Sequence, residues 1–276
     1  MSGRRDRTVS VGGATERTGG SLAEDERAVS GVVGYILVFS LITITIGTVF
    51  AVGITGVEDR RDAERVDNVE RAFEVFDDNL RDIQRYDDPN RATEVRLAGG
   101  ALSVAGETRF VLANTSDPDE VDNGTVAAWT SRPLAYRDGG TTIAYDAGAL
   151  VRGDGDGSVM LSEPRFVATD NRTTIPIVGL VRGSGDHSVA GEGTVQITTV
   201  EDATTSSETE RFEGGGETLY LWVETEHPDA WGRYFEETDG FGNATPAGAE
   251  GVVVAELNHS ETVYVRETAR VISLRR

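Results

Sequence analysis

The sequence predicts an α+β protein: a long N-terminal helix, made of a membrane span and an amphipathic extension, followed by an all-β, sandwich-like domain. Three observations carry this prediction. Residues 28–57 contain no charged residue, residues 58–88 continue with an amphipathic helical pattern, and residues 91–276 contain short apolar runs between Gly, Asp, Asn and Pro. A chain of 276 residues is long enough to bury a sizeable core.

Residues 1–27 are rich in Gly, Ser, Thr and Arg and contain few apolar residues. Such a segment cannot bury enough apolar surface to order itself. It is expected to be a leader or a disordered tail.

Residues 28–57 predict a transmembrane helix. The alternative is a buried core helix, but a core helix rarely lacks charge on every face over 30 residues, and about 20 apolar residues suffice to cross a bilayer. The apolar run is also too long for a cleaved secretory signal, whose run is about 7–15 residues. Gly31, Gly34, Gly47, Gly53 and Gly56 in this segment favour close packing between helices in lipid.

Residues 58–88 predict an amphipathic helical extension that ends before Pro89. Its apolar residues alternate at spacings of three and four, with charged residues on the other faces. This stripe predicts either a coiled coil or packing beneath the following domain, and we favour packing because the stripe is short. Asp67–Arg71 and Asp77–Arg81 are expected to form i, i+4 ion pairs. The stripe consists of Val66, Val69, Phe73, Phe76, Leu80 and Ile83.

Residues 91–276 are expected to form an extracellular β-rich domain of sandwich or barrel type. Gly99-Gly100 between two alternating runs predicts a hairpin, a short helix is expected to start at Asp229, and residues 201–217 are expected to form an exposed loop. The expected strands are Val95–Ala98, Leu102–Val104, Phe110–Ala113, Val126–Trp129, Thr142–Tyr145, Val159–Leu161, Phe166–Ala168, Ile175–Leu180, Val195–Val200, Leu219–Glu224, Val252–Leu257, Val263–Arg266 and Val271–Leu274.

Composition excludes several classes of function. The chain has no cysteine and no lysine, and its formal net charge is −21. Thiol catalysis, disulfides and zinc–thiolate sites are therefore excluded, and binding to nucleic acid is not expected because phosphate recognition needs cations. The acidic surface is either one that repels partners or an adaptation to very high salt, where the screening length falls to about 3 Å. We favour the salt adaptation of a halophile.

The sequence contains no recognisable catalytic, cofactor-binding or metal-binding motif, so we do not expect an enzyme and expect no cofactor. His187, His227 and His259 are isolated from one another. The run Asp154-Gly155-Asp156-Gly157 predicts a β-turn, with a surface calcium loop as the alternative. Four aromatic residues are expected to pack in the core, with a surface patch that binds glycans as the alternative: Trp129, Trp222, Trp231 and Tyr234.

Five of the eight asparagines begin an N-x-[ST] sequon, and all five follow the apolar segment. Such sequons are glycosylation candidates on an exported domain. The positive-inside rule disagrees, because Arg60, Arg61, Arg65 and Arg71 lie within 20 residues after the segment, against Arg17 and Arg27 within 20 residues before it. We expect the large domain outside the cell, since that rule is weak for long domains. The sequon asparagines are Asn114, Asn123, Asn171, Asn243 and Asn258.

Residues 24–39, EDERAVSGVVGYILVF, resemble the N-terminal junction of haloarchaeal type IV pilin-like proteins, although Gly31 stands where that family usually has Pro. Residues 61–79 and 91–97 are similar to an uncharacterised haloarchaeal family of single-span, pilin-like membrane proteins. The resemblance implies processing by a prepilin peptidase after Arg27-Ala28, which exposes Val29 as the new N-terminus.

These observations predict a single-pass protein of the cell membrane, a minor or accessory subunit of a type IV pilus-like surface filament. Its expected partners are membrane lipid and other pilin-like subunits. The physical reason is that an apolar helix can leave the bilayer only by packing against other helices. The alternative function is a monomeric, membrane-anchored extracellular binding module.

Overall fold

The computed structural model describes residues 22–86, 90–155, 157–169, 171–202, 209–246, 251–258 and 262–276. Within these ranges an N-terminal helix precedes a large β-rich domain, which confirms the predicted α+β class. The chain divides into two compact units, Met1–Arg60 and Arg61–Arg276. The second unit contains the last turns of the long helix together with the described strands, and we call it the β domain.

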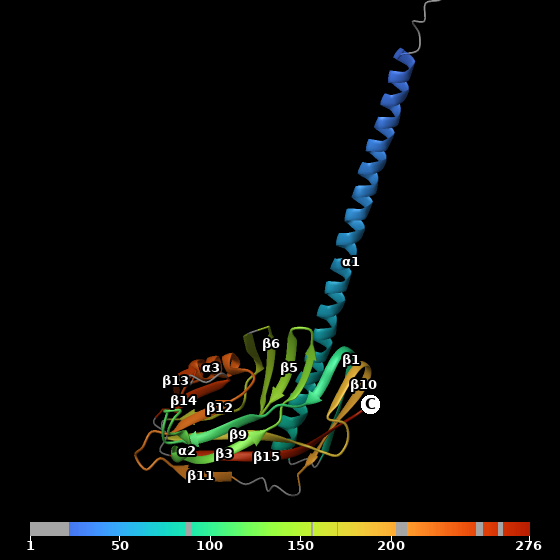
Figure 1. Ribbon diagram of the computed structural model, residues 1–276. Coiled ribbons are helices and arrows are strands. Elements are labelled where there is room, and N and C mark those ends of the chain that lie inside the picture. Colours follow the sequence, from blue (N-terminus) through green and yellow to red (C-terminus); the bar gives the residue numbers. More distant parts are fainter. Residues whose placement is uncertain are drawn as a thin grey trace, which may run out of the picture. The chain divides into compact units, whose positions relative to one another are not determined.

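Figure 1 shows the elements along the chain and labels those for which there is room. The helices are α1 (Leu22–Tyr86), α2 (Val121–Gly124) and α3 (Pro228–Glu237). The strands are β1 (Asn90–Val104), β2 (Thr108–Ala113), β3 (Thr125–Ser131), β4 (Leu134–Asp138), β5 (Thr141–Asp146), β6 (Ala149–Asp154), β7 (Gly157–Ser162), β8 (Val167–Thr169), β9 (Arg172–Arg182), β10 (Ser188–Glu201), β11 (Thr209–Glu213), β12 (Tyr220–Glu224), β13 (Phe241–Pro246), β14 (Val252–Leu257) and β15 (Thr262–Arg275).

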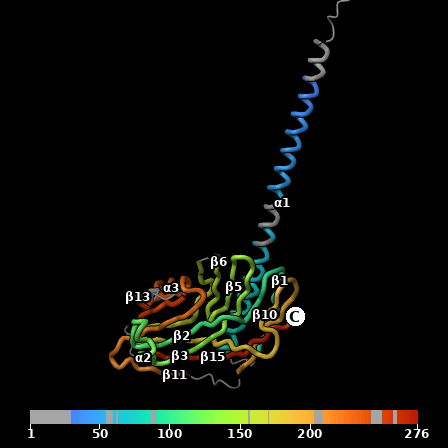
Figure 2. Tube along the Cα trace, in the orientation of Figure 1, coloured from blue at the N-terminus to red at the C-terminus, as the bar shows by residue number. Residues whose placement is uncertain are grey.

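The described strands form two sheets. The larger sheet has ten strands in the order β7-β6-β5-β4-β1-β10-β15-β9-β8, with β11 paired to β15 off this path. The smaller sheet has the order β13-β14-β12-β2-β3. Pairing is antiparallel except between β9 and β15, which run parallel over their length. Figure 2 traces the chain from α1 to a C-terminus that lies beside β10.

Both faces of the larger sheet are buried, each against a different layer. Along β15, Val263 and Val265 contribute to a core shared with the smaller sheet and α3, whereas Ile272 and Leu274 contribute to a core shared with α1. Successive side chains of a strand point to opposite faces, so this change from odd to even residues marks a change of face. The β domain is therefore a sandwich of two sheets with a helix packed on the outer face of the larger one.

Helix α1 begins at Leu22, before the predicted start at residue 28. The intervening residues, Leu-Ala-Glu-Asp-Glu-Arg, include good helix formers. The helix ends at Tyr86, three residues before Pro89, as its pattern predicts. Residues 1–21 of the expected leader lie outside the described residues.

The predicted hairpin at Gly99-Gly100 is wrong, because β1 runs through both glycines as one strand. They form a bulge instead: the register with β10 shifts between Ala98 and Ala101, and φ is 135° at Gly99 and 66° at Gly100. A Cβ at position 100 would lie 2.7 Å from the carbonyl oxygen of Arg137, so glycine is needed there. The bulge lets one strand pair with β10 throughout and with β4 near its end.

Two further predictions concern short segments. The helix expected at Asp229 is α3, which begins one residue earlier with Pro228 in its first turn. The expected loop at 201–217 is partly wrong, since Thr209–Glu213 forms β11 against β15. The sequence of β11 is polar and most of its residues are exposed, so no apolar alternation marks it as a strand.

Candidate anchoring and docking site

The apolar segment of α1 is Ser30–Ile54, which contains 25 residues. It is long enough and apolar enough to cross a membrane. None of it is buried by the rest of the protein. Its large side chains are widely exposed, from 45% at Ile54 to 72% at Tyr35. The core helix of a soluble protein is covered by the rest of the protein. This exposure therefore distinguishes the segment from a core helix.

Three threonine hydroxyls of this segment are hydrogen-bonded within the helix. Thr43, Thr45 and Thr48 each donate a hydrogen bond of 2.8 Å to the carbonyl oxygen four residues earlier. Moving a polar group from water into hydrocarbon without a hydrogen-bond partner costs on the order of several kcal/mol, because the group loses its hydration. Because each of these hydroxyls bonds to a carbonyl oxygen of its own helix, the threonines are compatible with a lipid environment.

The second half of α1 docks on the larger sheet through the predicted stripe. Five of the six residues are at most 1% exposed, and Val66 is half-buried at the edge of the same core. The ring of Phe76 meets that of Tyr145 edge to face at 5.3 Å. The favoured prediction of packing beneath the β domain is confirmed. We call Val69, Phe73, Phe76, Leu80 and Ile83 the docking stripe.

An ion pair on the same face of α1, between Asp77 and Arg81, is hydrogen-bonded to β7. Arg81 Nε donates to both carboxylate oxygens of Asp77 at 2.9 Å, as the i, i+4 spacing predicts. Ser162 on β7 donates to Asp77 Oδ2 at 2.7 Å and accepts from Arg81 at 2.6 Å. Burial opposes the charge on Arg81, but the hydrogen bonds and charge of Asp77 raise its pKa above the ordinary value.

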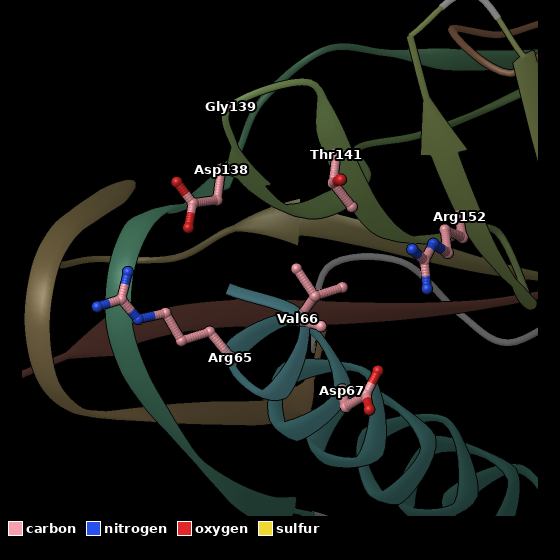
Figure 3. Close-up of a pocket in the computed structure, with 8 residues that line it drawn as sticks. Arg65, Val66, Asp67, Asp138, Gly139, Thr141 and Arg152 are labelled. Carbon is pink, nitrogen blue, oxygen red and sulfur yellow. The ribbon is translucent and has the colours of Figure 1, made fainter. Parts of the chain in front are cut away.

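A cavity of about 410 Å³ lies between α1 and the β4–β5 hairpin. Figure 3 shows Arg65, Val66 and Asp67 on the helix below Asp138 and Thr141 on the hairpin, with Arg152 reaching in from β6. The lining is mixed in charge and is specialised for neither anions nor cations.

Several groups at this cavity are paired with one another. Arg152 contacts Glu70 at 3.2 Å and Asp154 at 2.8 Å. Hydrogen bonds from Thr141 and Arg152 lower the pKa of Asp154, so it stays ionised. Burial, followed by the charge of Asp138, raises the pKa of Tyr136 to about 12. The Arg152–Glu70 pair joins α1 to β6 beside the cavity.

One fully buried carboxyl group lies between the two sheets. Asp146 is fully buried, and its Oδ2 accepts hydrogen bonds from Thr225 at 3.0 Å and from the Trp231 indole at 3.3 Å. Burial raises the pKa of Asp146 and lowers that of the neighbouring His227. These groups join β5, α3 and the residues after β12. Because they are buried in the core, we interpret them as structural.

The β6–β7 turn and the four aromatic residues are arranged as the sequence predicts. Asp154 and Gly157 flank the turn of the β6–β7 hairpin, which confirms the turn; Asp156 lies outside the described residues. Across the part of the chain that the structure describes, no three His, Asp or Glu side chains are placed to hold a metal ion. Core packing of the aromatic residues is confirmed, since Trp129, Trp222, Trp231 and Tyr234 are at most 5% exposed.

The processing residues Arg27, Ala28 and Val29 lie on α1, and their side chains lie outside the described ones. His187 is exposed, and His259 is not among the described residues. The sequon asparagines Asn114, Asn123 and Asn171 are exposed, and Asn258 is half-buried after β14. Asn243 lies within β13, and its side chain is outside the described set.

Comparison with known proteins gives one match. Residues 27–272 match a family model described as "Family of unknown function (DUF7289)". No curated protein and no solved structure matches the chain.

Proposed function

The chain belongs to this family of unknown function, and we propose that it is a membrane-anchored, exported, pilin-like surface protein. In this proposal Ser30–Ile54 holds the chain in the membrane and packs against the same segment of other subunits. The β domain is then the part exposed outside the cell. The docking stripe makes the last turns of α1 part of that domain.

The observation that carries this proposal is the uncovered apolar segment. Fifteen large apolar side chains between Val32 and Ile54 are exposed. Leaving such a side chain in water costs about 1.5–3 kcal/mol, so the whole segment would cost tens of kcal/mol. Lipid or neighbouring helices must therefore cover it.

The resemblance of residues 24–39 to haloarchaeal pilin-like proteins favours assembly over a solitary anchor. It also implies a prepilin peptidase as a processing partner, acting after Ala28. A helix freed of its charged leader could move from the bilayer into a filament core of like helices. The acidic β domains would face the surrounding brine, whose salt screens their mutual repulsion.

Assembly through the apolar segment predicts specific contacts between subunits. Because the chain has no cysteine, single-cysteine variants at each position from 30 to 54 can be oxidised in the membrane, alone and mixed in pairs. Packed helices should give disulfide dimers whose yield rises and falls every three to four positions. Dimer yield on non-reducing gels is the measurement.

A matched control is Val167→Cys, which places an exposed cysteine on β8 of the β domain. This variant should give no dimer above the level expected for random collision. Uniformly low yields across the whole apolar segment would contradict assembly and favour the monomeric binding module.

A further inference from the structure

We propose that one end of the β domain carries a cluster of N-linked glycans, attached at Asn114, Asn123 and Asn171. The inference rests on the proposed function only in requiring that the domain is exported. It goes beyond the sequons themselves, because the structure gathers all five sequon asparagines, which span 144 positions of the chain, at one end of the domain. We call this end of the domain the sequon end.

Two of the asparagines meet beside the smaller sheet. Strand β2 ends at Ala113, which pairs with Tyr220 at the start of β12 and with Thr125 at the start of β3. The backbone N–H of Asn114 donates to the carbonyl oxygen of Gly124 at 3.0 Å. Asn123 is the residue before Gly124, so Asn114 and Asn123 are neighbours.

The other three asparagines reach the same end from later in the chain. The N–H of Leu257 donates to the oxygen of Leu219 at 2.9 Å, next to the start of β12. Asn258 then donates from its backbone N–H to Gly240, just before β13, which carries Asn243. Asn171 follows β8, and its carbonyl oxygen accepts from the N–H of Thr262, the first residue of β15, at 3.2 Å.

The sequon end is separate from the contacts of α1. Within the β domain, α1 bonds to Thr93 of β1, Arg152 of β6 and Ser162 of β7. Figure 1 shows α2 and β13 at one end of the domain and the last turns of α1 toward the other. Bulky glycans at the sequon end would leave the helix and its cavity uncovered.

Exposure distinguishes the asparagines as acceptors. Asn114, Asn123 and Asn171 are exposed, and the only described bond of the Asn114 side-chain amide is a surface contact of 3.0 Å with Glu217. Asn258 is different, because its amide packs where a Cβ of Gly242 would lie 2.6 Å away. A glycan on Asn258 would displace β13 whether it is attached before or after folding, so chains that reach this fold should carry none there.

The modification itself needs a co-reactant, a lipid-phosphate-activated oligosaccharide with its transferase. The asparagine Nδ2 attacks the anomeric carbon, a C–N bond forms, the C–O bond to phosphate breaks, and the lipid phosphate leaves. The amide gives up one proton to a base of the transferase. Ser116, the hydroxyl residue of the first sequon, is exposed, whereas Thr173 of the third is fully buried in β9. Transfer to Asn171 must therefore precede folding, but Asn114 remains available afterwards.

The test uses the full chain purified from the membranes of cells that normally make it. Digestion after arginine places Asn114 and Asn123 in one peptide, residues 110–132, so intact mass is measured for the variants Asn114→Gln, Asn123→Gln and Asn171→Gln. Each should lose one glycan mass. Asn258→Gln and the exposed, non-sequon control Asn90→Gln should lose none.

A second pair of variants separates modification from misfolding. Ser116→Ala should remove the glycan from Asn114, and Ser116→Thr should retain it with the same fold. A chain with no added mass on Asn114, Asn123 or Asn171, or with a glycan on Asn258, would overturn the proposal. An unmodified chain that still forms periodic disulfide dimers would overturn only the glycans and leave the proposed assembly intact.

Discussion

Replacing Phe76 by alanine is expected to lower the free energy of unfolding of the β domain by about 3–5 kcal/mol. Phe76 is 1% exposed, and its ring packs against Tyr145 on β5 and Phe73 on α1. The substitution removes the transfer free energy of a buried ring and leaves a cavity that helix and sheet cannot easily close. Denaturant unfolding of the full chain in detergent measures the loss.

The three tryptophans make the readout specific, because Trp129, Trp222 and Trp231 all lie in the β domain. The control is Val75→Ala, one residue earlier on the same helix, where the side chain is 53% exposed. Its effect should stay within about 0.5 kcal/mol. Equal effects of the two substitutions would mean that the docking stripe does not bind the sheet as described.

Replacing Asp77 by alanine is expected to cost about 3 kcal/mol, because it leaves Arg81 beneath the β domain without its carboxylate. The Asp77 side chain is 5% exposed and that of Arg81 is 18% exposed, so water screens the guanidinium poorly. The same substitution removes the acceptor of the Ser162 hydroxyl on β7. Thermal or denaturant unfolding of the full chain measures the effect.

Asp78→Ala is the matched control, since the neighbouring side chain is exposed. The double variant Asp77→Leu, Arg81→Met should recover much of the stability that Asp77→Ala loses. A single substitution leaves a buried charge without its partner, whereas replacing both residues removes that charge. If Asp77→Ala unfolded like Asp78→Ala, the ion pair would contribute nothing to docking.

The N-terminal half of the architecture could be predicted because its signals are local. An uncharged run and a three-four spacing each specify a helix and the face it buries, so the apolar segment and the docking stripe follow from the sequence. The Asp77–Arg81 pair is local as well. Its third partner, Ser162, lies 85 residues later on β7, and no pattern in the sequence connects them.

The β domain could be predicted only in outline. Runs such as Val252–Leu257 show strands clearly, but β4, β6, β11 and β13 were not among the expected strands. These are short or polar, or they contain Gly and Pro. Two expected strands, Val263–Arg266 and Val271–Leu274, are one long strand, because the polar residues between them are buried too: Thr268 and Arg270 are at most 4% exposed.

The order of the strands in the two sheets could not be predicted from the sequence. The parallel pairing of β9 with β15 joins segments about 90 positions apart, and many other registers would bury similar apolar surface. The sequons show the same limit: each is a local motif, but their gathering at one end depends on this topology. The processing at Ala28, the halophilic source and the type IV pilin-like filament stay predictions.

The most direct test of the central claim is to locate the chain after shearing intact cells, using an epitope at its C-terminus. We predict that the chain is found in the sheared filament fraction and in the membrane fraction, and that protease reaches the epitope on intact cells. A monomeric chain in the soluble fraction without detergent, or an epitope protected until lysis, would contradict an exported domain held by an apolar helix.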